Sequence, residues 1–148
     1  MNISAEITGL IDENRDDKAH GASELARQAV KALRAAAECS QAESSERFLL
    51  EQKEIGQRLI SSHPAMAPLF NIVSRLLNTI SGKAEGMDLD SLRHQAVSKA
   101  DELINDSLQA VAQIAYYGSR LIADGDKIMT HSYSSTVVAV LKEAFTNQ

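Results

Sequence analysis

The sequence predicts a mainly α fold, in which a bundle of about five helices is followed by one strand and one further helix. Three observations support this prediction. Apolar residues recur with the helical period along most of the chain. The 148 residues include only two Pro and seven Gly, which leaves room for long helices. Aromatic residues make up 4% and Trp is absent, so the core must be built from aliphatic side chains and Met.

The first three helices are expected at residues 3–13, about 21–39 and 45–62. Apolar side chains lie on one face of each, for example Ile3, Ile7, Leu10 and Ile11 in the first. Ser23 is the expected N-cap of the second helix. Pro64 is expected to end the third, because the residue before a proline disfavours helical geometry.

The fourth and fifth helices are expected at residues 65–80 and 88–122. The fourth has the clearest amphipathic repeat in the chain, and Ser81 and Gly82 follow it as a stop signal. Asp88 and Asp90 suit the positive N-terminal end of the fifth helix. This helix is the longest, and a kink or a division is expected near Tyr117 and Gly118.

The character of the sequence changes after residue 122. A turn signal at 123–126 is followed by a strand-like run at 127–130, a polar loop at 131–135 and a helix at about 136–145. This order is the first half of a βαβ unit, with which a doubly wound sheet begins. Because a lone strand leaves its backbone groups unpaired, the run at 127–130 is also expected to favour self-association.

Composition and charge exclude several classes of function. The net charge is −5 and no basic stripe is present, which argues against direct nucleic-acid binding. A single cysteine and four histidines in no recognised ligand spacing predict neither a metal site nor a cofactor. The first 21 residues lack a signal peptide and no apolar run approaches a membrane span of about 18 residues, so we expect a cytoplasmic protein without a membrane partner.

The polar loop before the last helix is the strongest candidate site. Backbone N–H groups and hydroxyls at the start of a helix form a geometry that binds phosphate. The candidate ligand-binding residues are His131, Ser132, Tyr133, Ser134 and Ser135. A glycine-rich nucleotide motif is absent, so a small phosphorylated ligand is the expectation, and helix capping by Ser134 or Ser135 without any ligand is the alternative.

The segment DGDKIMTHSYSSTVVAVLKE, residues 124–143, resembles the junction between two domains in the translation initiation factor 2B alpha/beta/delta family. That family includes methylthioribose-1-phosphate and ribose-1,5-bisphosphate isomerases. Residues 122–131 fit its I..DGD.ILTH pattern closely. Residues 20–23, HGAS, fall where the family often has RGA, and residues 63–67, HPAMA, fall where the isomerases have RPTAV.

The resemblance implies a helical N-terminal domain at 1–123 and, at 124–148, the first strand, loop and helix of a truncated Rossmann-like domain. It also implies that His20, Gly21 and His63 lie at the rim of a pocket. Other initiation factor or family subunits are the implied partners, in a homo- or hetero-oligomer.

Three departures from the isomerase pattern shape the functional expectation. Ser132 stands where the isomerases have their catalytic cysteine, and its hydroxyl is far harder to ionise than a thiol. His20 and His63 stand where arginines are expected to hold phosphate, and a neutral imidazole lacks the arginine fork. These departures predict that the chain is not an enzyme and has no catalytic residue.

The favoured function is therefore that of a non-catalytic subunit or domain that regulates translation initiation through protein–protein interaction and possible sensing of a phosphorylated ligand. The alternative is the N-terminal part of a sugar-phosphate isomerase-like enzyme. A second alternative is a helical oligomerisation scaffold.

Overall fold

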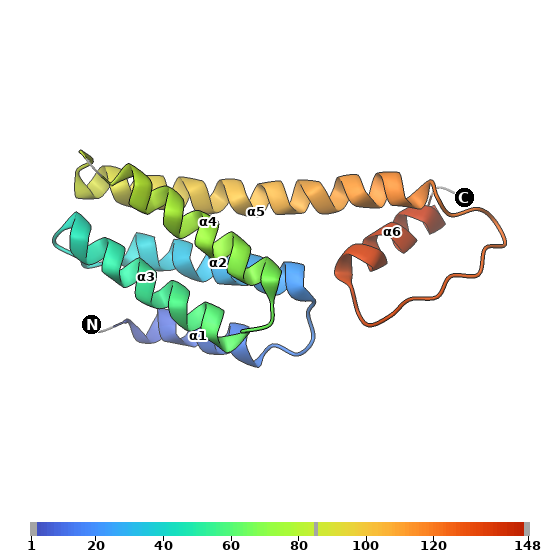
Figure 1. Cartoon of the computed structure of the whole chain (residues 1–148), viewed down its shortest axis with the longest axis horizontal. Coiled ribbons are helices and arrows are strands. Elements are labelled where there is room, and N and C mark those ends of the chain that lie inside the picture. Colours follow the sequence, from blue (N-terminus) through green and yellow to red (C-terminus); the bar gives the residue numbers. More distant parts are fainter. Residues whose placement is uncertain (1–2, 85, 147–148) are drawn as a thin grey trace.

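The computed structural model describes residues 3–84 and 86–146, and all regular secondary structure in this part of the chain is helical (Figure 1). The mainly α prediction is confirmed. The six helices are α1 (Ala5–Asp16), α2 (Ala22–Cys39), α3 (Ser45–Ser62), α4 (Ala67–Lys83), α5 (Leu89–Ser119) and α6 (Ser135–Thr146).

Helix α2 is the centre of the bundle and packs against α1, α3, α4 and α5. Its alanines allow close approach of the neighbouring helices, and Ala29, Val30 and Leu33 are fully buried. Phe48 of α3 and Leu69 of α4 are fully buried in the same core. None of the described helices is both long and apolar enough to span a membrane.

Local capping explains where several helices begin. The Ser44 hydroxyl accepts a hydrogen bond from the Arg47 N–H, and an Asp88 carboxylate oxygen accepts one from the Ser91 N–H. Helix α2 departs from the expectation, because its N-cap is Gly21, and Ser23 lies inside the helix. No side chain caps the α2 N-terminus.

Helix α5 is 31 residues long and packs against both the bundle and α6. Its N-terminal half buries Leu92, Ala96 and Leu103 in the bundle, while α6 packs beside its C-terminal end (Figure 1). The helix runs through Tyr117 and Gly118 without a division and ends at Ser119. Gly118 instead allows α6 to approach, since a Cβ there would lie 3.0 Å from a Val140 methyl carbon.

The strand expected at residues 127–130 is wrong for this structure. The connection between α5 and α6 contains no strand among the described residues. It forms a wide loop that extends away from the helices and returns to α6 (Figure 1). The physical reason is that a strand needs a neighbour to pair its backbone groups. Ile128 and Met129 are 50% and 96% exposed, so the apolar side chains in this run have nothing to cover them.

Candidate functional site

The polar loop at 131–135 leads directly into α6. His131, Ser132 and Tyr133 are exposed, whereas Ser134 and Ser135 are half-buried. The Ser134 hydroxyl accepts a hydrogen bond from the Val137 N–H at 3.3 Å, so Ser134 caps the helix, in agreement with the expectation that one of the two serines does so. Ser132 has a φ of 63°, a left-handed conformation that is uncommon outside glycine.

The loop lies against the N-terminus of α2. A Cβ placed on Gly21 would lie 3.6 Å from the backbone nitrogen of Ser135 and 3.6 Å from carbon atoms of the Tyr133 ring. The N-terminal ends of α2 and α6 therefore meet, although more than a hundred residues separate them in the sequence. Both ends carry the partial positive charge of the helix dipole and N–H groups without a partner inside the helix.

His20 stands next to this junction and is held by Asp17. Its Nδ1 lies 2.7 Å from Asp17 Oδ2, and its side chain is 53% exposed. Asp17 Oδ2 also accepts a hydrogen bond from Gln28 Nε2 at 2.9 Å, while Oδ1 accepts from the backbone N–H groups of Ala19 and His20. Hydrogen bonds from Gln28, and then from His20, hold the pKa of Asp17 well below its usual range.

His63 has a structural partner in the last turn of α1, close in sequence to Asp17. Its Nε2 lies 2.9 Å from the backbone carbonyl oxygen of Asn14, and its own carbonyl accepts the N–H of Met66 before α4. These bonds tie His63 to α1 and to the start of α4. The structure thus brings Gly21 to the loop at 131–135, whereas the hydrogen bonds of His20 and His63 go to α1, its C-cap and the start of α4.

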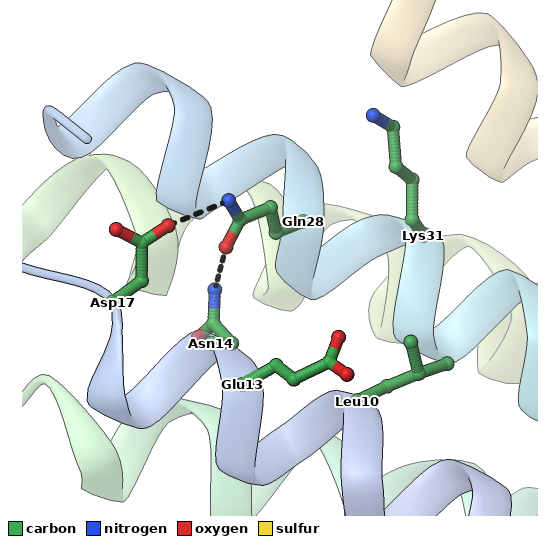
Figure 2. A pocket seen from close by; sticks show the side chains of 6 residues that line it. All are labelled: Leu10, Glu13, Asn14, Asp17, Gln28 and Lys31. Carbon is green, nitrogen blue, oxygen red and sulfur yellow. Dashed lines mark hydrogen bonds between the residues drawn. The ribbon is translucent and has the colours of Figure 1, made fainter. Parts of the chain in front are cut away.

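Sequence reasoning missed three polar residues behind His20. Asn14 is 1% exposed and donates from Nδ2 to the Leu25 carbonyl at 2.9 Å and to Gln28 Oε1 at 3.2 Å. Figure 2 shows Asn14, Gln28 and Asp17 joined in this order along a hollow of about 330 Å³ between α1 and α2. The hollow is lined by Leu10, Glu13, Asn14, Asp17, Gln28 and Lys31.

One signal for this cluster was present in the sequence. Asn14 continues the buried face of α1 after Ile7 and Ile11, and a polar residue on an apolar face needs partners. Gln28 carried no comparable signal. Within the described ranges, no group of three or more His, Cys, Asp or Glu side chains could hold a metal ion.

A second hollow, of about 650 Å³, lies between α3 and α4. It is lined by Leu49, Leu50, Phe70 and Leu77 together with polar residues of both helices. Leu50 and Phe70 are 50% and 53% exposed. The exposed surface of this hollow is mainly apolar, which suits contact with another protein better than binding of a phosphate.

Comparison with known proteins identifies the family to which the chain is similar. A sequence profile of the initiation factor 2 subunit family matches residues 18–148. A ribose 1,5-bisphosphate isomerase of Thermococcus kodakarensis is 31% identical over 148 residues, which is 98% of this chain and 45% of the relative. A putative translation initiation factor eIF-2B subunit 2-like protein of Pyrococcus furiosus is 30% identical over 142 residues, covering 96% of this chain and 46% of the relative.

A solved structure shares the fold across nearly the whole chain. The tetrameric eIF2B-beta2-delta2 complex from C. thermophilum matches with a TM-score of 0.80 and 26% identity, covering 97% of this chain and 47% of that one. This chain spans about half the length of the curated relatives it matches.

The expectation that the chain is not an enzyme is overturned by these relatives. Several that are about 30% identical over most of the chain are named ribose 1,5-bisphosphate isomerase, which is an enzyme. That expectation gave too much weight to single residues, Ser132, His20 and His63, and too little to the similarity of the chain as a whole. These relatives favour the isomerase alternative. The match over residues 18–148 shows that the chain belongs to the initiation factor 2 subunit family.

Proposed function

We propose that this chain forms the helical part of a sugar-phosphate isomerase of the ribose 1,5-bisphosphate type. In this proposal the loop at 131–135, together with Gly21 and His20, binds a phosphate group of the substrate. The observation that carries the proposal is the meeting of the α2 and α6 N-termini, with Gly21 against Ser135 and Tyr133. Two helix dipoles then act on one anion, and a helix N-terminus is a favourable place for phosphate.

The residues at the junction suit a binding role in aldose–ketose isomerisation. An isomerase must hold the sugar phosphate in one orientation while protons move between neighbouring carbons. Backbone N–H groups donate to phosphate oxygens at fixed positions, and the exposed hydroxyl of Ser132 lies in the same loop. A Cβ at Gly21 would touch Ser135 and the Tyr133 ring, so in this proposal a side chain there occupies part of the space beside the two helix ends.

The proposal includes two domains. Residues 1–123 form the helical domain, and residues 124–148 form the start of a Rossmann-like domain whose sheet would cover residues 127–130. The exposure of Ile128 and Met129 supports this division, since apolar side chains in an extended segment are usually covered by neighbouring strands. The phosphate site then lies at the boundary of the two domains, a common place for a ligand.

A titration with matched glycine variants tests the phosphate site. Calorimetry of the native protein with ribose 1,5-bisphosphate should show binding, and conversion to ribulose 1,5-bisphosphate should be measurable. Gly21→Ala should lower the affinity by about 10-fold by filling the junction and displacing one hydrogen bond to the anion. Gly9→Ala is the control, because nothing lies within 4 Å of a Cβ at that position.

The proposal also predicts the effect of the serines. Replacing both Ser134 and Ser135 by Ala should weaken binding of the sugar bisphosphate. Nucleoside monophosphates should bind less tightly than the sugar bisphosphate, because the loop lacks a nucleotide motif. Failure of the native protein to bind or convert any sugar phosphate would overturn the proposed function.

A second function, assembly with other family subunits, is favoured by the exposed apolar hollow between α3 and α4. The similar proteins include one named as an initiation factor subunit-like protein and one solved as a tetrameric complex. Phe70 is 53% exposed at this hollow, so Phe70→Ser should leave the fold intact and weaken assembly. Sedimentation velocity of the native protein measures this, and a mass unchanged by the substitution would exclude the hollow as an interface.

A further inference from the structure

The hollow between α3 and α4 carries two charged side chains on one face of α3. Glu46 and Lys53 both line the hollow, and both are exposed. They are seven residues apart, which is about two helical turns, so they lie on the same side of the helix. Leu49 and Leu50 lie between them and line the same hollow. This face of α3 therefore carries a negative charge, two apolar side chains and a positive charge in succession.

Neither of these charges has a partner in the described part of the chain. Glu46 and Lys53 make no hydrogen bond and no ion pair there. Another charged pair of the same helix is satisfied internally, because Arg58 donates to Glu54 Oε1 at 2.6 Å. Glu46 and Lys53 are thus available to a partner that offers the opposite charge to each of them.

The apolar part of the hollow extends from α3 onto α4, which lies beside it (Figure 1). Leu50 is 50% exposed and Phe70 of α4 is 53% exposed, and Leu77 also lines the hollow. Large apolar side chains that are half-exposed on two adjacent helices mark a surface for contact with another protein.

The order of the charges makes this surface complementary to itself. The midpoint between Glu46 and Lys53 falls between Leu49 and Leu50. If two copies of α3 cross antiparallel about a two-fold axis at that midpoint, Glu46 of each copy faces Lys53 of the other. A parallel pairing in register would instead place like charges together, which is unfavourable. An isologous contact of the antiparallel kind is the usual one in a symmetric dimer.

We propose that the hollow between α3 and α4 binds a second copy of this chain, with the two α3 helices antiparallel. The inference rests on the second of the proposed functions, assembly through this hollow, and it names the partner and its orientation. Leu50 and Phe70 of the two copies cover one another at the centre, and two pairs of Glu46 with Lys53 close the rim. Because one pair of helices from each copy gives a small interface, we expect a dissociation constant of about 1 to 100 µM.

Reversal of the charges tests the orientation. Association of the native protein is followed by sedimentation velocity over the micromolar range. Glu46→Lys leaves only positive charges at these two positions and Lys53→Glu leaves only negative ones, so each variant alone should associate about 10-fold more weakly or less tightly still. An equimolar mixture of the two variants should recover the association, because every lysine then faces a glutamate. The double variant, Glu46→Lys with Lys53→Glu, should associate as the wild type does.

Arg47→Glu is the matched control for Lys53→Glu. It makes the same change of charge in the same helix, at an exposed residue that does not line the hollow, and it should alter the association by less than about twofold. Circular dichroism should show the helix content of the wild type in every variant, since all the replaced side chains are exposed. Recovery on mixing reports this contact alone, because assembly through another surface does not require opposite charges at residues 46 and 53.

The outcomes separate the inference from the assembly function. Weak association of both single variants without recovery in their mixture would overturn the antiparallel pairing and leave the hollow as an interface. Single variants that associate like the wild type, while Phe70→Ser does not, would likewise overturn the inference alone. A wild type that stays monomeric over this range, or association that neither the charge reversals nor Phe70→Ser alter, would overturn both.

Discussion

Replacing Gly118 by Ala is expected to weaken phosphate binding at the loop 131–135, although Gly118 lies outside the site. A Cβ at this position would lie 3.0 and 3.1 Å from the two methyl carbons of Val140. These contacts are tighter than carbon atoms normally pack, so Val140 must retreat by a few tenths of an ångström. Val140 is β-branched and cannot turn away easily, so α6 as a whole has to shift.

Two opposing effects set the change in stability. Ala favours helix over Gly by about 1 kcal/mol, and overpacking costs about 1 to 3 kcal/mol, so the net loss should be about 0 to 2 kcal/mol. That loss leaves the protein folded if its total stability is in the usual range of about 5 to 15 kcal/mol. The shift of α6, however, moves Ser135 away from Gly21 and separates the two helix ends, which should cost about 10-fold or more in affinity.

The assay combines urea denaturation with calorimetric titration of ribose 1,5-bisphosphate. Val140→Ala provides the matched rescue, because the double variant Gly118→Ala with Val140→Ala removes the two crowding methyls and should recover most of the affinity. Wild-type affinity in Gly118→Ala alone would refute the argument, since it would mean that α6 does not need to approach α5 this closely for the site to form.

Three further predictions concern stability and can be measured by chemical or thermal denaturation followed by circular dichroism. Gly56→Ala would place a Cβ 2.7 Å from the Leu77 Cδ1, whereas the Cβ of Gly9→Ala would meet nothing within 4 Å. The Gly56→Ala variant should therefore be about 1 to 2 kcal/mol less stable than Gly9→Ala. Equal stabilities of the two variants would contradict the close crossing of α3 and α4. Phe48→Ala should lose about 3 to 5 kcal/mol, since Phe48 is fully buried, and a loss under about 1 kcal/mol would place it outside the core. Because the folded-state pKa of Asp17 is depressed, its stabilising effect is present above the unfolded pKa of about 3.9 and is lost as the pH falls toward the folded value. Asp17→Asn should therefore be less stable than the wild type at pH 7, and the difference should shrink below about pH 4; a difference that persists unchanged at pH 2 would argue against a depressed pKa.

The helices could be predicted from local signals. The third helix was expected at residues 45–62 and is observed as Ser45–Ser62, because a capping serine precedes it and a proline follows soon after it. The ends of the fifth helix agree less well, since it stops at Ser119 rather than near residue 122. Helix ends depend on a few backbone hydrogen bonds and on fraying, which periodicity does not report.

The strand and the site depended on contacts between distant residues. The run at 127–130 has strand-like residues, but pairing is not a local property, and no neighbour is present among the described residues. Likewise, the loop at 131–135 was found from its own sequence, whereas its approach to Gly21 required the packing of α6 on α5. The hydrogen bond from Gln28 to Asp17 links the end of α1 to α2, and no sequence motif predicts it.

The length and continuity of α5 have a mechanical consequence. At about 1.5 Å per residue, its 31 residues extend about 46 Å, and one end belongs to the bundle while the other supports α6. A rigid rod of that length acts as a lever, so a tilt of about 5° at the buried end would carry the far end through about 4 Å.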